Sequence, residues 1–120
     1  MNTSIKATHI KLTEEIQSYV EKKMGSVEEK FTESEDTVAC TIELAKTRDQ
    51  KHGPVYYAEA NMQVNGTLFR ATAEEESTEA AIDKVKDELQ RELRDARTKH
   101  KDRMKKGGAK AKRMLQAAVF

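Results

Sequence analysis

Hydrophobic and polar residues recur with two different periods along the chain, and these periods divide it into elements. Near the N-terminus, Ile5 and Ala7 alternate with polar neighbours, which is the two-residue period of a half-buried strand. Thr13 then precedes apolar residues at spacings of three and four, so the pattern predicts an amphipathic helix that Thr13 caps. Because this stripe continues past Gly25, we expect one helix despite a cost of about 1 kcal/mol for that glycine. The stripe consists of Ile16, Val20, Met24, Val27 and Phe31.

A second strand is expected at residues 38–44, where apolar and polar residues alternate again. The charged residues 46–52 predict a loop after this strand, and Gly53-Pro54 closes the loop. The inward face of the strand would carry Val38, Cys40, Ile42 and Leu44.

Two further strands form a predicted hairpin. Residues 56–64 alternate, and the following Asn65-Gly66 is the strongest short-range signal for a two-residue hairpin turn. The partner strand is expected to run from Thr67 to about Ala73.

The last pattern is helical. Ser77 or Thr78 is expected to cap a helix, whose apolar stripe is Ala81, Ile82, Val85, Leu89, Leu93 and Ala96. Gly107-Gly108 is predicted to end it, because glycine is a poor helix former. Residues 109–120 are expected to be disordered or weakly helical.

The order β-α-β-β-β-α predicts an α+β domain. Each helix has one apolar stripe, so both helices should pack on one face of a mainly antiparallel four-stranded sheet. The other face should remain in water, because its expected side chains are polar. They are Lys6, Thr41, Glu43, Glu59, Asn61 and Gln63.

Charge is distributed unevenly along the 120 residues, a length that suits one domain. The first 96 residues contain 13 basic and 20 acidic residues, whereas residues 97–113 contain nine Lys or Arg and one acid, Asp102. We therefore divide the chain into an α+β domain at 1–100 and a basic, flexible C-terminal tail at 101–120. Such a tail favours a polyanionic partner, because phosphate binding releases counterions. The alternative is a frayed end that only improves solubility.

Residues with catalytic or metal-binding chemistry are sparse. His9, His52 and His100 lack ligand spacing with one another and with Cys40, which is expected to be a buried structural thiol. We therefore expect no enzymatic activity, no metal or other cofactor and no small-molecule substrate. No apolar run approaches the ~18 residues of a membrane span. The start Met1-Asn2-Thr3-Ser4 lacks signal-peptide features, so the cytoplasm is the expected location.

The last helix carries charges of opposite sign on the two flanks of its apolar stripe. At 100° per residue, one flank consists of Lys86, Gln90, Arg94, Arg97 and Lys101. The other flank consists of Glu88, Glu92 and Asp95. Segregated signs favour an oriented anionic partner over a plain solvated surface, although a solvated surface remains possible.

The first helix has a comparable edge. Tyr19, Lys23, Ser26 and Lys30 align along it, and Lys22 lies beside them. Two basic edges on neighbouring helices could bind phosphates, and the absence of obvious base-reading residues indicates recognition of shape and backbone.

The pattern as a whole resembles the bacterial ribosome hibernation-promoting factors, a family also called ribosome-associated inhibitor A or protein Y, in its short form. The resemblance covers about residues 1–100 and depends on the order and spacing of several short motifs. These are Ile10-Lys11-Leu12-Thr13-Glu14, Tyr19-Val20-Glu21-Lys22-Lys23, Val64-Asn65-Gly66, Ala80-Ala81-Ile82-Asp83, and Leu89, Arg91 and Leu93.

The resemblance implies a fold similar to a double-stranded-RNA-binding domain with an added first strand. It also implies a translation inhibitor, monomeric off the ribosome, whose partner is the small ribosomal subunit and its rRNA. Bound in the decoding channel, it would block messenger and transfer RNA and stabilise idle ribosomes. The family's RNA contacts map onto Lys22, Lys23 and Arg91, with Arg94 adjacent. With the helix flanks, the expected RNA-binding set is Lys22, Lys23, Lys30, Lys86, Arg91, Arg94, Arg97 and Lys101.

The chain departs from the family pattern at three acidic positions. Glu88 stands where the family usually has lysine, Asp95 lies near another such position, and Glu79 replaces a common aromatic. We expect Lys86, Arg97 and the basic tail to compensate for the lost charge. Longer family members carry a second domain, for which 120 residues leave no room.

Two other functions remain open from the sequence. The first is a non-enzymatic protein-interaction module that uses the acidic stripe or the open sheet face. The second is a generic RNA binder that acts through the basic tail. Truncation at about Lys99 would separate both from RNA binding by the folded domain.

Overall fold

The computed structural model describes the backbone of residues 2–49 and 53–117, and the side chains of residues 2–47 and 53–98. The order β-α-β-β-β-α is confirmed. The elements are β1 (Asn2–Thr8), α1 (Glu14–Phe31), β2 (Val38–Asp49), β3 (Gly53–Val64), β4 (Thr67–Glu75) and α2 (Thr78–Ala117).

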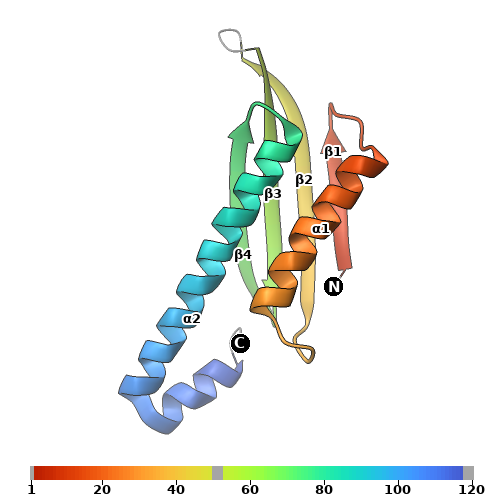
Figure 1. Cartoon of the computed structure of the whole chain (residues 1–120). Coiled ribbons are helices and arrows are strands. Elements are labelled where there is room, and N and C mark those ends of the chain that lie inside the picture. The colour runs from red at the N-terminus through yellow and green to blue at the C-terminus, as the bar shows by residue number, and fades with distance from the viewer. Residues whose placement is uncertain (1, 50–52, 118–120) are drawn as a thin grey trace.

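The strands form one sheet in the order β1-β2-β3-β4, in which β1 runs parallel to β2 and the other two pairs are antiparallel. Both helices cover the same face of this sheet, and the opposite face is open (Figure 1). The predicted mainly antiparallel α+β architecture is therefore confirmed.

The core lies between the sheet and the two helices, where the predicted apolar stripes meet. From α1 it contains Val20, Met24, Val27 and Phe31, and from α2 it contains Ala81, Ile82, Val85, Leu89 and Leu93. The strands contribute Cys40, Ile42, Leu44, Ala58, Ala60, Met62, Val64, Phe69 and Ala71. Ile16 is half-buried and packs at the margin.

Local hydrogen bonds set the element boundaries. The Ile16 amide donates to Thr13 Oγ1 over 3.1 Å, so Thr13 caps α1 as predicted. Ser77 performs the same role for α2, because its Oγ accepts from the Ala80 amide at 3.1 Å. At the hairpin, Asn65 and Gly66 have φ values of 50° and 87°, the positive values that a type I′ turn requires.

The predicted loop at residues 46–52 is wrong for the part that the structure describes. β2 continues to Asp49 and β3 begins at Gly53, with Lys46 opposite Tyr56 and Thr47 opposite Val55. The charged side chains had indicated a loop, but a strand that extends past the core can keep such side chains in water. Residues 50–52 lie outside the described residues.

The predicted helix end at Gly107-Gly108 is also wrong, because α2 continues through both glycines to Ala117. Each glycine costs a helix about 1 kcal/mol, but the neighbouring Lys, Arg and Ala residues are strong helix formers. The ribbon changes direction in the C-terminal part of α2 (Figure 1). Residues 118–120 lie outside the described residues.

The open sheet face carries the predicted polar side chains, but Glu59 is only 9% exposed there. Arg70 donates to Glu59 through Nε at 2.8 Å and also through its second guanidinium nitrogen. Tyr57 and Asn61 donate to the same carboxylate at 3.3 and 3.4 Å. Arg70 and its neighbours therefore cover Glu59, which a strand pattern alone would leave in water.

This cluster predicts a loss of stability in acid. Burial alone would raise the pKa of Glu59, but the hydrogen bonds and charge of Arg70, helped by Asn61 and Tyr57, lower it below its ordinary value of 4.5. The group therefore stabilises the fold above about pH 4.5, and this stabilisation is lost as the pH falls through the lower folded pKa. In urea titrations, Glu59→Gln should be less stable than wild type at pH 7, and the difference should shrink towards pH 3. Glu29→Gln, an exposed carboxylate on α1, is the matched control and should follow the wild-type profile.

Cys40 is a free cysteine in the core. Burial raises the pKa of its thiol from 9.0 to about 12, and the charge of Glu28 adds to the shift. Because such a shift reduces the thiolate about a thousandfold at neutral pH, a thiol reagent should react far more slowly with the native protein than in urea. A Gln63→Cys variant provides an exposed thiol on the open face and should react at once. Equal rates at the two positions would contradict the burial of Cys40.

Candidate nucleic-acid interface

The basic edges predicted on the two helices face each other. α1 and α2 lie side by side on the sheet and run in the same direction (Figure 1). Tyr19 and Lys23 of α1 both contact Asp83 of α2, so these flanks form the boundary between the helices. The basic residues on the two flanks are Lys23, Lys30, Lys86, Arg94 and Arg97, which we call the inter-helix strip.

One end of the strip is a polar bridge between the helices. The Tyr19 hydroxyl donates to Asp83 Oδ1 over 2.6 Å, and Lys23 Nζ lies 3.2 Å from the same oxygen. Lys23 Nζ also lies 5.2 Å from the centroid of the Tyr19 ring. The hydrogen bond from Tyr19, together with Lys23, lowers the pKa of Asp83 despite some burial, so this carboxylate is ionised at neutral pH.

The other end of the strip is a cation–π contact. The guanidinium carbon of Arg97 lies 5.5 Å from the centroid of the Phe31 ring, at the end of α1. Arg97 is half-buried, and its guanidinium packs against the ring of a buried core residue. Between the two ends, Lys30 and Arg94 are exposed and Lys86 is half-buried.

Two residues of the predicted set lie outside the strip, and a third is not described. Lys22 is exposed on α1, next to the strip. Arg91 is exposed on the outer surface of α2 and pairs with Glu88 at 3.3 Å, which is a weak surface interaction. The side chain of Lys101 lies outside the described residues.

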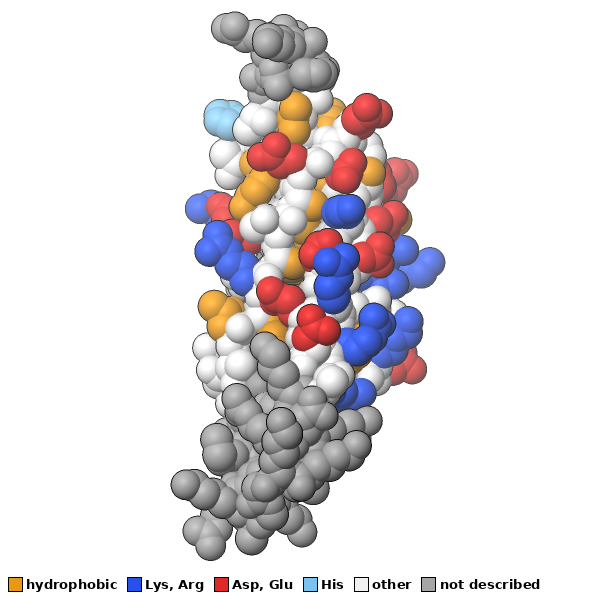
Figure 2. All heavy atoms as spheres, turned by 90° about the vertical axis from the view of Figure 1, so that its left-hand side faces the viewer, with side chains coloured by type: hydrophobic (Ala, Val, Ile, Leu, Met, Phe, Trp, Pro, Cys, Tyr) orange, Lys and Arg blue, Asp and Glu red, His pale blue; other side chains and the backbone are white. Residues whose placement is uncertain are grey.

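The acidic flank of α2 faces β4, away from α1. Glu92 accepts a hydrogen bond from the backbone amide of Arg70 at 3.1 Å, so it occupies a donor on the outer edge of the sheet. On this side of the molecule acidic and basic side chains are mixed (Figure 2). Two acids of the predicted stripe, Glu88 and Glu92, therefore have partners within the protein.

Sequence reasoning missed the role of Asp83. This residue lies three positions before Lys86, on the flank that we treated as basic, and its spacing could have indicated an acidic residue within the strip. The bond between Glu92 and the edge of β4 had no comparable signal, because it depends on which strand α2 covers.

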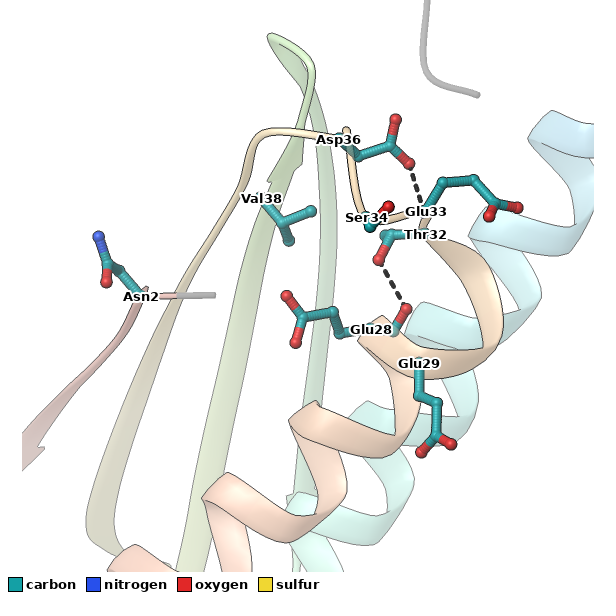
Figure 3. A pocket seen from close by; sticks show the side chains of 8 residues that line it. All are labelled: Asn2, Glu28, Glu29, Thr32, Glu33, Ser34, Asp36 and Val38. Atoms are coloured by element: carbon teal, nitrogen blue, oxygen red, sulfur yellow. Dashed lines mark hydrogen bonds between the residues drawn. The ribbon is translucent and has the colours of Figure 1, made fainter.

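A hollow of about 580 Å³ lies at the C-terminal end of α1, beside the turn that leads to β2. Figure 3 shows its lining, in which the Thr32 hydroxyl donates to the Glu28 carbonyl at 2.6 Å and Asp36 accepts from the Glu33 amide at 2.7 Å. The carboxylates of Glu28, Glu29, Glu33 and Asp36 all belong to this hollow, so it repels phosphate. Among the described residues, no group of His, Cys, Asp and Glu has the arrangement of a metal site. No helix of the described part is long and apolar enough to cross a membrane.

Comparison with solved structures shows the same fold elsewhere. The N-terminal domain of Protein Y from Thermus thermophilus superposes with a TM-score of 0.64 at 24% identity, covering 78% of this chain and 96% of that one. A ribosomal subunit interface protein from Coxiella burnetii has the same TM-score at 16% identity, with 82% and 99% covered. At these identities the likeness concerns the fold alone.

Comparison of sequences extends the likeness to a family. The ribosome hibernation promoting factor of Escherichia coli is 30% identical over 105 residues, which are 88% of this chain and 98% of that protein. The ribosome hibernation promotion factor of a Picosynechococcus species is 32% identical over 102 residues, and the chain spans about half (51%) of its length. None of these names is that of an enzyme. Residues 3–103 match the family described as sigma 54 modulation protein / S30EA ribosomal protein, and the chain belongs to that family.

Proposed function

We propose that this protein promotes ribosome hibernation by binding the rRNA of the small subunit in the decoding channel. Bound there, it blocks the messenger and transfer RNA sites and stabilises the idle ribosome. Membership of a family whose relatives are named ribosome hibernation promoting factors supports the role. The observation that carries the RNA-binding part is the inter-helix strip, in which two helices present basic flanks to each other.

The strip suits a phosphate backbone better than bases. Lys30 and Arg94 are exposed, and Lys86 and Arg97 are half-buried. Lys22 and Arg91 extend the basic area on either side, and Lys101, whose side chain lies outside the described residues, is proposed as a further contact. Cations of this kind contribute affinity through counterion release and recognise the shape of the RNA. Glu88 and Asp95 stand outside the strip and leave its charge intact.

The proposal is tested by co-sedimentation of the purified protein with ribosomes at low and raised salt. The full chain is compared with a truncation after Lys99, which removes most of the basic tail. We expect both forms to pellet with the small subunit, to dissociate as salt rises, and to displace initiator transfer RNA. Such binding would also place the protein in the cytoplasm, with the site in a domain at residues 1–100.

A second function is a generic RNA binder that acts through the tail. The observation in its favour is the concentration of nine basic residues between 97 and 113. If only the full-length protein pellets, and total RNA competes as well as ribosomes do, this second function is correct. If neither form binds ribosomes, a protein-interaction module becomes the better description.

A further inference from the structure

The bridge between Tyr19, Lys23 and Asp83 joins α1 to α2 within the inter-helix strip. We propose that Asp83 is a positioning residue for RNA binding. It fixes the spacing of the two basic flanks through Tyr19 and Lys23, and Lys23 serves this bridge rather than a phosphate. The inference rests on the proposed function, which it refines by separating residues that contact RNA from residues that hold them in place.

The surroundings of Lys23 differ from those of a free phosphate ligand. Its side chain is 25% exposed, its ammonium pairs with Asp83 at 3.2 Å, and it lies over the ring of Tyr19. A phosphate contact would require Lys23 to leave both partners. Lys22, its neighbour in the chain, is exposed and available.

The contacts of the bridge shift the pKa of each of its groups in the direction that preserves the bridge. The hydrogen bond with Asp83 raises the pKa of Lys23, and the same carboxylate raises the pKa of Tyr19. Each group therefore stabilises the protonation state that its partner needs at neutral pH. The charges of Lys23 and Asp83 offset each other, which leaves the net positive charge of the strip to Lys30, Lys86, Arg94 and Arg97.

The spacing matters because phosphates along an RNA strand have a fixed separation. A binding constellation works when its side chains are held by locked neighbours, within roughly 0.5 Å of the productive geometry. The bridge at Asp83 and the Arg97–Phe31 contact are separated by about 21 Å along α2, at 1.5 Å per residue. Together with the core that the two helices share, these two joins hold the distance and the relative rotation of the helices.

The test measures small-subunit affinity of the full chain against salt concentration for Lys23→Met, Asp83→Asn and Tyr19→Phe. Lys22→Met is the matched control, because it removes the same charge from the adjacent exposed position. Affinity falls as salt rises, and the magnitude of the slope of log affinity against log salt, called the slope below, counts phosphate contacts. Loss of one contact reduces this magnitude by about 1. Circular dichroism at the assay temperature verifies that each variant is folded, and Tyr19→Phe is the mildest of them.

The expected result is a separation of affinity from slope. Lys22→Met should lower the slope by about 1. Lys23→Met and Asp83→Asn should each weaken binding by about tenfold at every salt concentration, with an unchanged slope. A variant that carries both Lys23→Met and Asp83→Asn should bind no more weakly than either single variant. Tyr19→Phe should have a smaller effect of the same kind. If charge alone determined affinity, Asp83→Asn would strengthen binding instead of weakening it, because removal of an anion favours phosphate binding.

The inference is overturned if Lys23→Met lowers the slope as Lys22→Met does, or if Asp83→Asn binds more tightly than wild type. Either result, with tight and salt-dependent wild-type binding, removes the positioning role and leaves the proposed function standing. If the wild-type protein does not bind the small subunit, the proposed function itself is wrong. The two failures are therefore distinguishable in one set of titrations.

Discussion

The double replacement of Arg91 and Arg94 by Glu is expected to lower affinity for the small subunit by at least about a hundredfold. Two cations that can contact phosphates become anions that repel them, and each lost contact also removes its counterion release. Both side chains are exposed and project away from the buried stripe of α2, so the fold should persist. Filter binding at fixed salt measures the affinity, and circular dichroism measures the helical content.

The control for this prediction applies the same change of charge elsewhere. Lys6 lies on the open sheet face and Lys11 lies in the loop before α1, and both are exposed. Their replacement by Glu should change affinity by less than about threefold, because distant exposed charges are screened by salt. Equal losses in the two double variants would mean that net charge, rather than the helix surface, determines binding.

Leu89→Ala should destabilise the fold more than any surface change. Leu89 is completely buried on α2, and its truncation leaves a cavity that costs about 2–5 kcal/mol. A domain of this kind is stabilised by roughly 5–15 kcal/mol in total, so the variant should lose a large part of its free energy of unfolding. Urea denaturation followed by circular dichroism measures the difference.

Leu68→Ala is the matched control, because it removes the same atoms from a side chain that is 57% exposed on β4. Its free energy of unfolding should stay within about 0.5 kcal/mol of wild type. A large loss at Leu68 together with a small loss at Leu89 would contradict the placement of the core between helices and sheet. The pair thus tests the layer arrangement without reference to function.

The order of the elements and their inward faces could be predicted from the sequence alone. Val20, Met24 and Val27 recur at helical spacing, and all are buried, because burial of one stripe follows directly from period and polarity. Thr13 and Asn65-Gly66 act over three or four residues, so their cap and turn could also be predicted. The family resemblance was predictable for the same reason, since it depends on the order of such local motifs.

The boundaries of β2, β3 and α2 needed the tertiary structure. Charged residues at 46–49 continue a strand because the partner strand β3 supplies hydrogen bonds opposite them. The helix passes Gly107-Gly108 because the weak preference of two residues yields to that of their neighbours. In both cases the residues have the local preference that the sequence indicated, but the surrounding structure has the larger effect on where the element ends.

The arrangement of the candidate site depends on how the helices pack. Helical period places Lys23 and Lys86 around their own helix axes, but it contains no information about which neighbour each flank meets. The packing of α1 against α2 turns the two basic flanks towards each other, pairs Lys23 with Asp83, and directs Glu92 to the edge of β4. The partners of Asp83 and Glu92 lie 22 to 64 positions away in the chain, as Arg70 does from Glu92 and Tyr19 from Asp83, and the sequence pattern of one element cannot specify a partner at that distance.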